Sequence, residues 1–156
     1  MKLFDGFEAV KFHQENMIFI TNQTQLNLCR VIFVTKNAMM KVVDGGEFDV
    51  SKRTVAATKL MDDDEVVSIV PLVFQRNIVM QTKDGYFLKF VIDEIPEKKK
   101  NAIGVRGMKM ADKDCIEKVY YIQNGTEHVI KYKSKKIDLN KLKLNKRDSK
   151  GTKVRL

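Results

Sequence analysis

The side chains that could do chemistry in this sequence are cations, and they gather in short loops that recur along the chain. Lys98-Lys99-Lys100 follows Pro96, and shorter basic pairs stand at Lys52-Arg53 and Lys146-Arg147. Cations repeated at a regular spacing can neutralise successive phosphates of a nucleic acid without contacting its bases. We therefore predict a polyanion-binding surface. The residues assigned to it are Lys52, Arg53, Lys59, Lys98, Lys99, Lys100, Arg106, Lys109, Lys146, Arg147, Lys150 and Lys153.

The charge of the chain is unevenly distributed. The 156 residues carry 29 Lys and Arg against 20 Asp and Glu, a net charge of +9. Residues 1–96 have a net charge of −2, whereas residues 97–156 have a net charge of +11. Such a basic part is typical of proteins that bind DNA, RNA or an acidic membrane surface. The sequence leaves one alternative open, which is that the lysine-rich loops are ordinary solvated surface.

Other reactive groups are too sparse for an active site. The two histidines, His13 and His128, stand alone, and the acidic run Asp62-Asp63-Asp64 lacks the spacing of a calcium loop, so we expect a turn there. Cys29 and Cys115 have no metal-ligand spacing and indicate a reducing compartment. The sequence therefore predicts no catalytic residue, no metal site and no cofactor in this chain.

The elements that must position the cations are short strands. Residues 30–35, 77–82 and 86–92 are rich in branched and aromatic side chains, and Asp84-Gly85 is a strong hairpin signal. No sustained helical periodicity is present. No apolar run approaches the roughly 20 residues that cross a bilayer, which argues against a membrane partner. The predicted fold class is all-β.

The strands repeat with a period of nearly 50 residues. Residues 31–37 align with 78–84 at an offset of 47, and residues 54–60 align with 104–110 at an offset of 50; the offset expected between Val105-Arg106 and Val154-Arg155 is 49. Residues 9–20 resemble a lysine-bearing strand and the strand after it. A period of this length with four strands is typical of propeller blades. The predicted units of a single domain over 1–156 are the tail of a blade (1–29), two blades (30–76 and 77–125) and the head of a blade (126–156).

These segments resemble the C-terminal domain of the A subunit of bacterial type IIA topoisomerases, the family of DNA gyrase and topoisomerase IV. The residues that carry the resemblance are 46–60, 78–90 and 95–109, the last containing Gly104-Val105-Arg106-Gly107, together with the ending at 146–156. The match covers residues 30–156 well and 1–29 weakly. The glutamine- and arginine-rich box that marks gyrase is absent, which favours a subunit like that of topoisomerase IV or the later blades of gyrase. The sequence does not decide between the two enzymes.

The resemblance implies a β-pinwheel, a propeller-like partial disc of about three four-stranded blades that exchange strands, whose basic rim binds and bends double-stranded DNA. It also implies that the cleavage tyrosine, ATP and Mg²⁺ belong to other parts of the holoenzyme, and that the partners are the ATPase B subunit together with the catalytic core of the A subunit. The implied location is the bacterial cytoplasm, in association with the nucleoid.

Two alternatives remain open at this stage. One is a propeller fragment that binds an acidic protein partner, for which the charge on the rim would be incidental. The other is a plain β-sandwich whose internal similarity is a coincidence. An incomplete disc would also expose strand edges, so self-association is possible.

Overall fold

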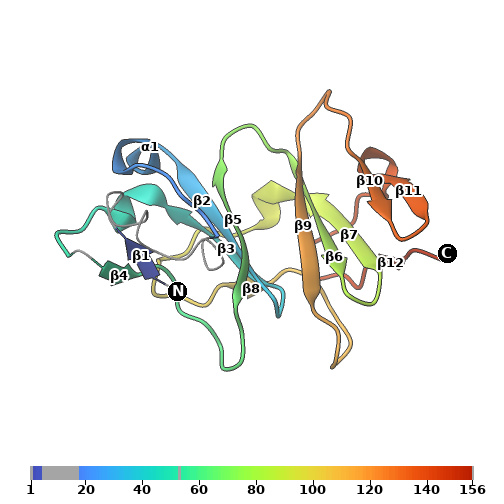
Figure 1. The fold of residues 1–156 in the computed structure, drawn as a ribbon, viewed down its shortest axis with the longest axis horizontal. Coiled ribbons are helices and arrows are strands. Elements are labelled where there is room, and N and C mark those ends of the chain that lie inside the picture. Colours follow the sequence, from blue (N-terminus) through green and yellow to red (C-terminus); the bar gives the residue numbers. More distant parts are fainter. Residues whose placement is uncertain (1, 5–17, 53, 156) are drawn as a thin grey trace.

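The computed structural model describes residues 2–4, 18–52 and 54–155, and within them two four-stranded antiparallel sheets stand side by side (Figure 1). One sheet has the strand order β5–β2–β3–β8, with bounds Val66–Leu72, Arg30–Thr35, Met39–Asp44 and Val105–Arg106. The other has the order β9–β6–β7–β12, with bounds Ile116–Ile122, Asn77–Thr82, Tyr86–Val91 and Thr152–Lys153. The all-β prediction is confirmed.

Each sheet receives its last strand from the following sequence unit. Strand β8 pairs with β3, and β12 pairs with β7, at positions that repeat every 47 residues. Thr152-Lys153 is therefore the counterpart of Val105-Arg106, and the expected alignment with Val154-Arg155 is wrong. The register follows the backbone instead of the Val-Arg identity, because Gly104 and Gly151 precede the two strands with φ of +100° and +78°. Residues other than glycine rarely adopt this backbone conformation. Gly104 and Gly151 therefore occupy equivalent positions before their edge strands.

The central strands form because their side chains are apolar on both faces. Strands β2, β3, β6 and β7 each bury four or five consecutive residues, which is the pattern of a sheet that is covered on both sides. The acidic turns expected from the sequence support the adjacent hairpins. Asp64 Oδ1 accepts a hydrogen bond from the amide of Asn37 at 2.9 Å, and Asp114 Oδ1 accepts one from the amide of Asp84 at 3.0 Å.

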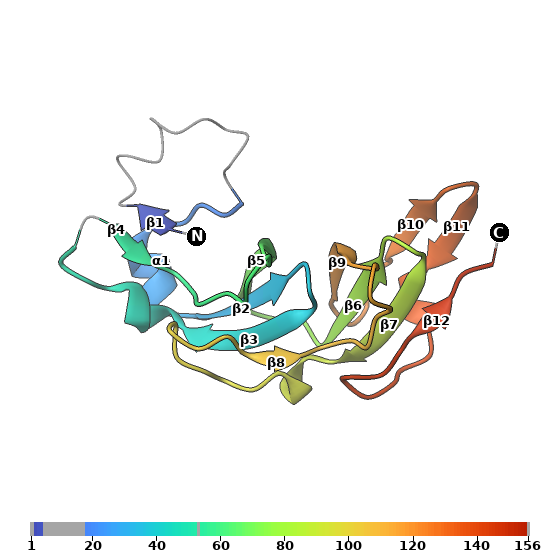
Figure 2. The ribbon, with the colours of Figure 1, turned by 90° about the horizontal axis from the view of Figure 1, so that it is seen from below.

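Three apolar layers alternate with the two sheets. The middle layer packs residues such as Ile32 and Met40 of the first sheet against Met80 and Phe90 of the second. Strands β5 and β9 are neighbours on the inside of a shallow arc, whereas β8 runs along its outside (Figure 2). This arrangement puts β8 and β12 at the edges of their sheets.

The free face of the first sheet is covered by helix α1 (Gln23–Asn27) and the 3-10 helix η3 (Gly45–Phe48), which supply Leu26 and Phe48 to one apolar cluster with Phe33. The strand expected at 17–20 is not formed at residues 18–20, because Phe19 packs onto this cluster instead. Residues 5–17, with most of the predicted blade tail, lie outside the described residues. Strand β1 (Lys2–Phe4) pairs with β4 (Thr54–Ala56).

The opposite end of the arc carries the hairpin of β10 (Val129–Tyr132) and β11 (Lys135–Asp138), which the 3-10 helix η5 (Leu139–Lys141) follows. Another 3-10 helix, η4 (Ile92–Glu94), follows β7 in the second unit. One face of the hairpin packs Ile130 and Tyr132 against the second sheet. The other face exposes Lys131 and Lys136, which are register partners. In the described residues the sheet of this third unit consists of β10 and β11 alone, because β12 of the same unit joins the second sheet, so two of the expected blades have four strands.

Candidate nucleic-acid interface

Two of the predicted basic loops, at 97–104 and 144–151, run alongside strands β3 and β7 of the preceding unit and lead into its edge strand. In the first blade the amide of Lys98 donates to the carbonyl of Val42 at 2.8 Å, and in the second blade the amide of Asn145 donates to the carbonyl of Lys89 at 2.9 Å. These two bonds are again 47 residues apart. Both loops therefore lie at the outer edges of their sheets, beside β8 and β12.

The same spacing relates three exposed lysines. Lys52, Lys99 and Lys146 occupy equivalent positions at intervals of 47 residues, and all three side chains are exposed. No ion pair joins them to an acidic side chain in the part of the chain that the structure describes. The same holds for Lys59, Lys98 and Lys109. These six residues are defined here as the rim lysines.

Lys100 and Arg147 have intramolecular partners instead. Lys100 Nζ donates to the carbonyl of Glu47 at 2.9 Å, and Arg147 Nε donates to the carbonyl of Glu94 at 3.0 Å. The amide of each cation in turn contacts the carboxylate of the same glutamate, at 3.4 Å and 2.8 Å. We call this pair of contacts between a cation and a glutamate the clasp. The two clasps are 47 residues apart in the sequence, and each attaches a basic loop to the 3-10 turn of the preceding unit.

Arg106 forms a two-pronged ion pair with Asp148. Its Nε donates to Oδ1 at 2.5 Å and its Nη2 to Oδ2 at 3.2 Å. The hydrogen bond with Arg106 holds the pKa of the Asp148 carboxyl below its usual value, and the charges of Lys109 and Arg147 act in the same direction. The pair joins β8 of the first blade to the loop that enters the second. The Arg106 charge is therefore largely balanced within the protein.

Two further predicted cations lie over an aromatic ring. Lys150 Nζ and Lys153 Nζ stand 5.7 Å and 5.4 Å from the centre of the Tyr86 ring, and both residues are exposed. Contacts of this kind are worth about 0.5–1 kcal/mol at an exposed site and leave the ammonium accessible. Arg53, the remaining predicted contact, lies outside the described residues.

Sequence reasoning missed two buried lysines that shape this region. Lys41 is 1% exposed and Lys89 is 8% exposed. Lys89 Nζ donates to the carbonyl of Asn140 at 2.8 Å, and Lys41 Nζ donates to three carbonyls of the loop that carries Lys98 and Lys99. The sequence signal for both residues was a lysine inside an otherwise apolar strand. Because a charged side chain is buried only with polar partners, such a lysine indicates a hydrogen-bonded ammonium in the core.

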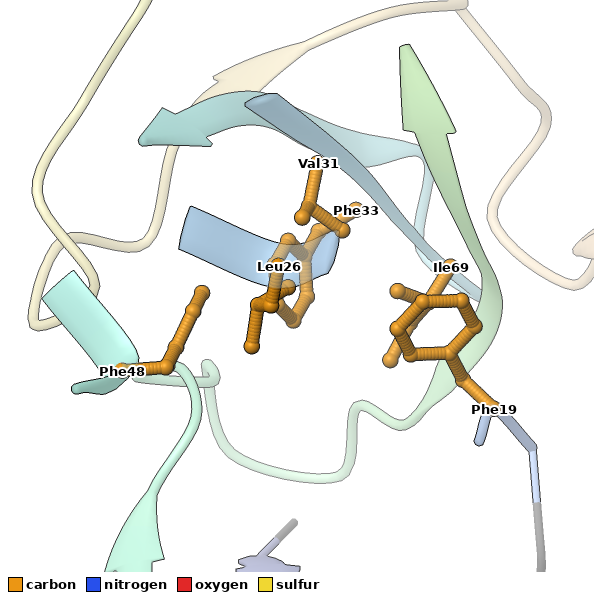
Figure 3. A pocket seen from close by; sticks show the side chains of 6 residues that line it. All are labelled: Phe19, Leu26, Val31, Phe33, Phe48 and Ile69. Carbon is orange, nitrogen blue, oxygen red and sulfur yellow. The ribbon is translucent and has the colours of Figure 1, made fainter. Parts of the chain in front are cut away.

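An apolar pocket lies between the first sheet and the covering helices (Figure 3). The side chains that line it are Phe19, Leu26, Val31, Phe33, Phe48 and Ile69. No polar or titratable group lines it, so it offers no acid, base or nucleophile.

The remaining chemistry in the described residues is equally sparse. No group of three or more His, Cys, Asp and Glu residues there could hold a metal ion. Cys29 and Cys115 are free thiols, each partly buried. Among the same residues no helix is long and apolar enough to span a bilayer. The site that the geometry defines is a cationic outer edge on a strand-exchanged, bladed sheet structure.

This is the architecture of a β-pinwheel, and the sequence places the chain in one family of that class. Residues 30–72 and 76–120 match the family of the DNA gyrase C-terminal domain, a beta-propeller. The chain belongs to this family, and the predicted resemblance is confirmed. The two matched segments correspond closely to the sequence units 30–76 and 77–125, which supply β2 to β5 and β6 to β9.

Individual relatives carry the names of the same two enzymes. The chain is 23% identical over 148 residues to the A subunit of DNA topoisomerase 4 from Streptococcus pneumoniae serotype 4, covering 90% of this chain and 18% of that protein. It is 26% identical over 97 residues to the A subunit of DNA gyrase from Rickettsia bellii, covering 61% of this chain and 11% of that protein. The chain thus spans less than a fifth of the length of these relatives.

Solved structures show the same fold. The chain superposes on the C-terminal domain of DNA topoisomerase IV with a TM-score of 0.73 and 24% identity, covering 88% of this chain and 42% of that one. For the E. coli ParC C-terminal domain the TM-score is 0.69 at 17% identity, with coverage of 81% and 56%. The predicted pinwheel fold is confirmed by these superpositions.

Proposed function

We propose that this chain is a DNA-binding module of a bacterial type IIA topoisomerase A subunit, which binds double-stranded DNA on its outer edge without reading the sequence. The observation that carries the proposal is the 47-residue spacing of three exposed lysines: Lys99 and Lys146 lie on the loops that lead into the edge strands β8 and β12, and Lys52 precedes strand β4. Lysines contact phosphates as mobile point charges and carry little base specificity.

The strand exchange supports this proposal, because it fixes the basic loops that carry Lys99 and Lys146 at corresponding places on the two blades. A row of cations along a curved edge favours a curved duplex. Smooth bending of 20–30 base pairs costs about 1–6 kcal/mol, and additional phosphate contacts offset that cost. The proposed contacts are the six rim lysines together with Lys150 and Lys153, while Arg106, Lys100 and Arg147 hold the loops in place.

The chain contributes no catalytic residue to this activity in the proposal. Strand cleavage and ATP hydrolysis, with Mg²⁺, belong to the B subunit and to the catalytic core of the A subunit, which are its proposed partners in the bacterial cytoplasm. The choice between gyrase and topoisomerase IV is not part of the proposal, since relatives of both names match this chain.

The test is the affinity of the chain for a labelled 30-base-pair duplex, measured by fluorescence anisotropy at several salt concentrations. The variant Lys52→Ala/Lys99→Ala/Lys146→Ala removes three proposed phosphate contacts. Because each contact contributes about 0.9 to the slope of log K against log salt, we expect the slope to become shallower by about 3.

The matched control is Lys83→Ala/Lys113→Ala/Lys118→Ala. It removes the same number of charges from exposed lysines away from the proposed edge. Lys83 lies in the turn between β6 and β7, Lys113 in the acidic turn before β9, and Lys118 in β9 on the inside of the arc. If the control weakens DNA binding as much as the rim variant does, only net charge matters and the proposed edge is wrong. An acidic protein partner would be favoured instead if neither variant nor the unmodified chain bound the duplex.

A further inference from the structure

Lys41 is a charged residue buried within the central strand β3 of the first blade. Its side chain is 1% exposed, and Nζ donates to the carbonyl oxygens of Lys99 at 3.1 Å, Lys100 at 2.8 Å and Ala102 at 2.6 Å. An ammonium has three N–H donors and no acceptor, so all three are used. All three acceptors belong to one turn, in which the amide of Ala102 also donates to the carbonyl of Lys99.

The surroundings of this ammonium provide no direct ion pair. The centre of the Phe33 ring lies 5.6 Å from Nζ, and the charged group that acts on the ammonium is the Glu47 carboxylate. Burial lowers the pKa of Lys41 to about 8, while the charge of Glu47 acts in the opposite direction. The ammonium is therefore mostly charged at neutral pH, and the carbonyl dipoles of the turn replace its lost hydration.

The second blade shows that the sheet does not need this lysine. Lys41 is the register partner of Phe33, and 47 residues later Leu88 is the register partner of Met80. Leu88 is fully buried in the apolar layer between the sheets. A leucine thus fills the equivalent position of a complete blade, so the lysine serves something that is particular to the first blade.

What is particular to the first blade is the loop. Lys98-Lys99-Lys100 is followed by Asn101, whereas its counterpart is Asn145-Lys146-Arg147-Asp148. In the second blade, exposed side chains fix the loop. Arg106 pairs with Asp148, and the Arg147 guanidinium donates to the backbone carbonyls of Glu94 and Arg106. The first blade has the clasp of Lys100 on Glu47, and Lys41 adds three bonds from inside.

We propose that Lys41 is a positioning residue for the proposed DNA contacts: its buried ammonium fixes the turn at 99–102 so that the exposed side chains of Lys98 and Lys99 are held toward the duplex. Lys41 cannot contact a phosphate itself, because it has almost no exposed surface. The inference rests on the proposed function, and its test is arranged so that the two can fail separately.

The test variant is Lys41→Leu, which installs the residue that the second blade has at this position. We expect the variant to fold, with faster hydrogen exchange at the amides of residues 98–102 and faster tryptic cleavage after Lys98, Lys99 and Lys100. We also expect about tenfold weaker binding of the 30-base-pair duplex at 100 mM salt. The slope of log K against log salt should become shallower by about 2, as for the loss of two phosphate contacts.

The matched control is Lys89→Leu, which removes the other buried lysine without touching the turn at 99–102. It should leave hydrogen exchange at residues 98–102 unchanged. A second variant, Lys41→Met, keeps the length of the side chain, and it should loosen the turn in the same way as Lys41→Leu. If both Lys41 variants fail to fold, the lysine is needed for the blade itself and the positioning role is overturned.

The outcomes separate the two proposals. If Lys41→Leu leaves amide exchange at the turn, DNA affinity and salt slope unchanged, Lys41 has no positioning role, whatever binds to the edge. If Lys98→Ala/Lys99→Ala binds DNA as the unmodified chain does, the proposed contacts of this loop are wrong, even where Lys41→Leu loosens the turn. Both proposals are supported when the two variants weaken binding by a similar factor and only Lys41→Leu changes the exchange rates.

Discussion

The hydrogen bond between Ser68 and Tyr121 offers a direct test of how the two blades are held together. Strand β5 of the first blade carries Ser68, and strand β9 of the second carries Tyr121, with 2.7 Å between the two hydroxyl oxygens. The bond therefore joins two sheets across the inside of the arc (Figure 2). Substitution Tyr121→Phe removes the hydroxyl and keeps the ring in the inter-sheet layer.

The expected cost follows from the burial of this pair. A typical intramolecular hydrogen bond contributes about 0.5–1.5 kcal/mol, and a partner left unsatisfied in a buried place adds to the loss. We expect Tyr121→Phe to lower the free energy of unfolding by about 1–2 kcal/mol. In a double-mutant cycle with Ser68→Ala the coupling energy should be about 1 kcal/mol, because the two residues are in contact.

The assay is urea unfolding of the four proteins of the cycle, followed by circular dichroism, at several pH values. Burial raises the pKa of the Tyr121 phenol above its usual value of 10.0, while the hydrogen bond with Ser68 acts in the opposite direction. The unfolded chain loses this proton near pH 10 and the folded chain keeps it, so the contribution of Tyr121 is complete below pH 10 and declines above it. A coupling energy near zero, or equal pH dependence of Tyr121→Phe and the unmodified chain above pH 10, would refute this account of the inter-blade contact.

Three further predictions concern a glycine, a pair of surface lysines and the buried lysine Lys41. Gly104→Ala should destabilise the chain by at least 2 kcal/mol in urea unfolding, because φ is +100° and the new Cβ would lie 2.4 Å from the carbonyl oxygen of Met40; unchanged stability would refute the assigned backbone constraint. Lys131→Ile/Lys136→Val should make the chain self-associate in analytical ultracentrifugation, since it replaces a cationic outer face with an apolar one; a monomer at all concentrations would count against this. Between pH 8 and 10.5 the free energy of unfolding of the unmodified chain should rise by about 2–3 kcal/mol relative to Lys41→Leu, because the unfolded state binds the additional proton there; parallel curves would contradict the assigned burial of the charge.

The sequence predicts the strands and their repetition well, because the signals are local. Asp84-Gly85 sets a hairpin turn with φ of +83° at the glycine, and the branched side chains of β2 and β6 require burial on both faces. Three of the segments that carry the family resemblance, 46–60, 78–90 and 95–109, lie within the family match at 30–72 and 76–120, and the fourth, 146–156, lies outside it.

The exact register of the third unit could not be predicted in this way. Val154-Arg155 is identical to Val105-Arg106, and identity favours an offset of 49. In the structure the residues equivalent to Val105-Arg106 are Thr152-Lys153, two positions earlier. This register is set by the pairing of β12 with β7, a strand about 65 residues away in the sequence. Residues so far apart in sequence are brought together by the tertiary fold, which a local comparison does not contain.

The charges illustrate a second limit. Sequence patterns identify the basic loops but treat every cation in them alike. The structure separates Lys99, which is exposed, from Lys100, Arg106 and Arg147, whose polar groups are bound to Glu47, Asp148 and Glu94. Which cation remains available depends on partners 41 to 53 residues away.

The central claim is that the outer edge binds duplex DNA through phosphates alone. Its most direct measurement is the affinity of the unmodified chain for two unrelated duplexes of equal length between 50 and 200 mM salt. Equal affinities and a slope of log K against log salt of about −7 are expected if each of the eight proposed contacts, the six rim lysines together with Lys150 and Lys153, neutralises one phosphate. No binding at 50 mM salt, or a strong preference for one sequence, would contradict the claim.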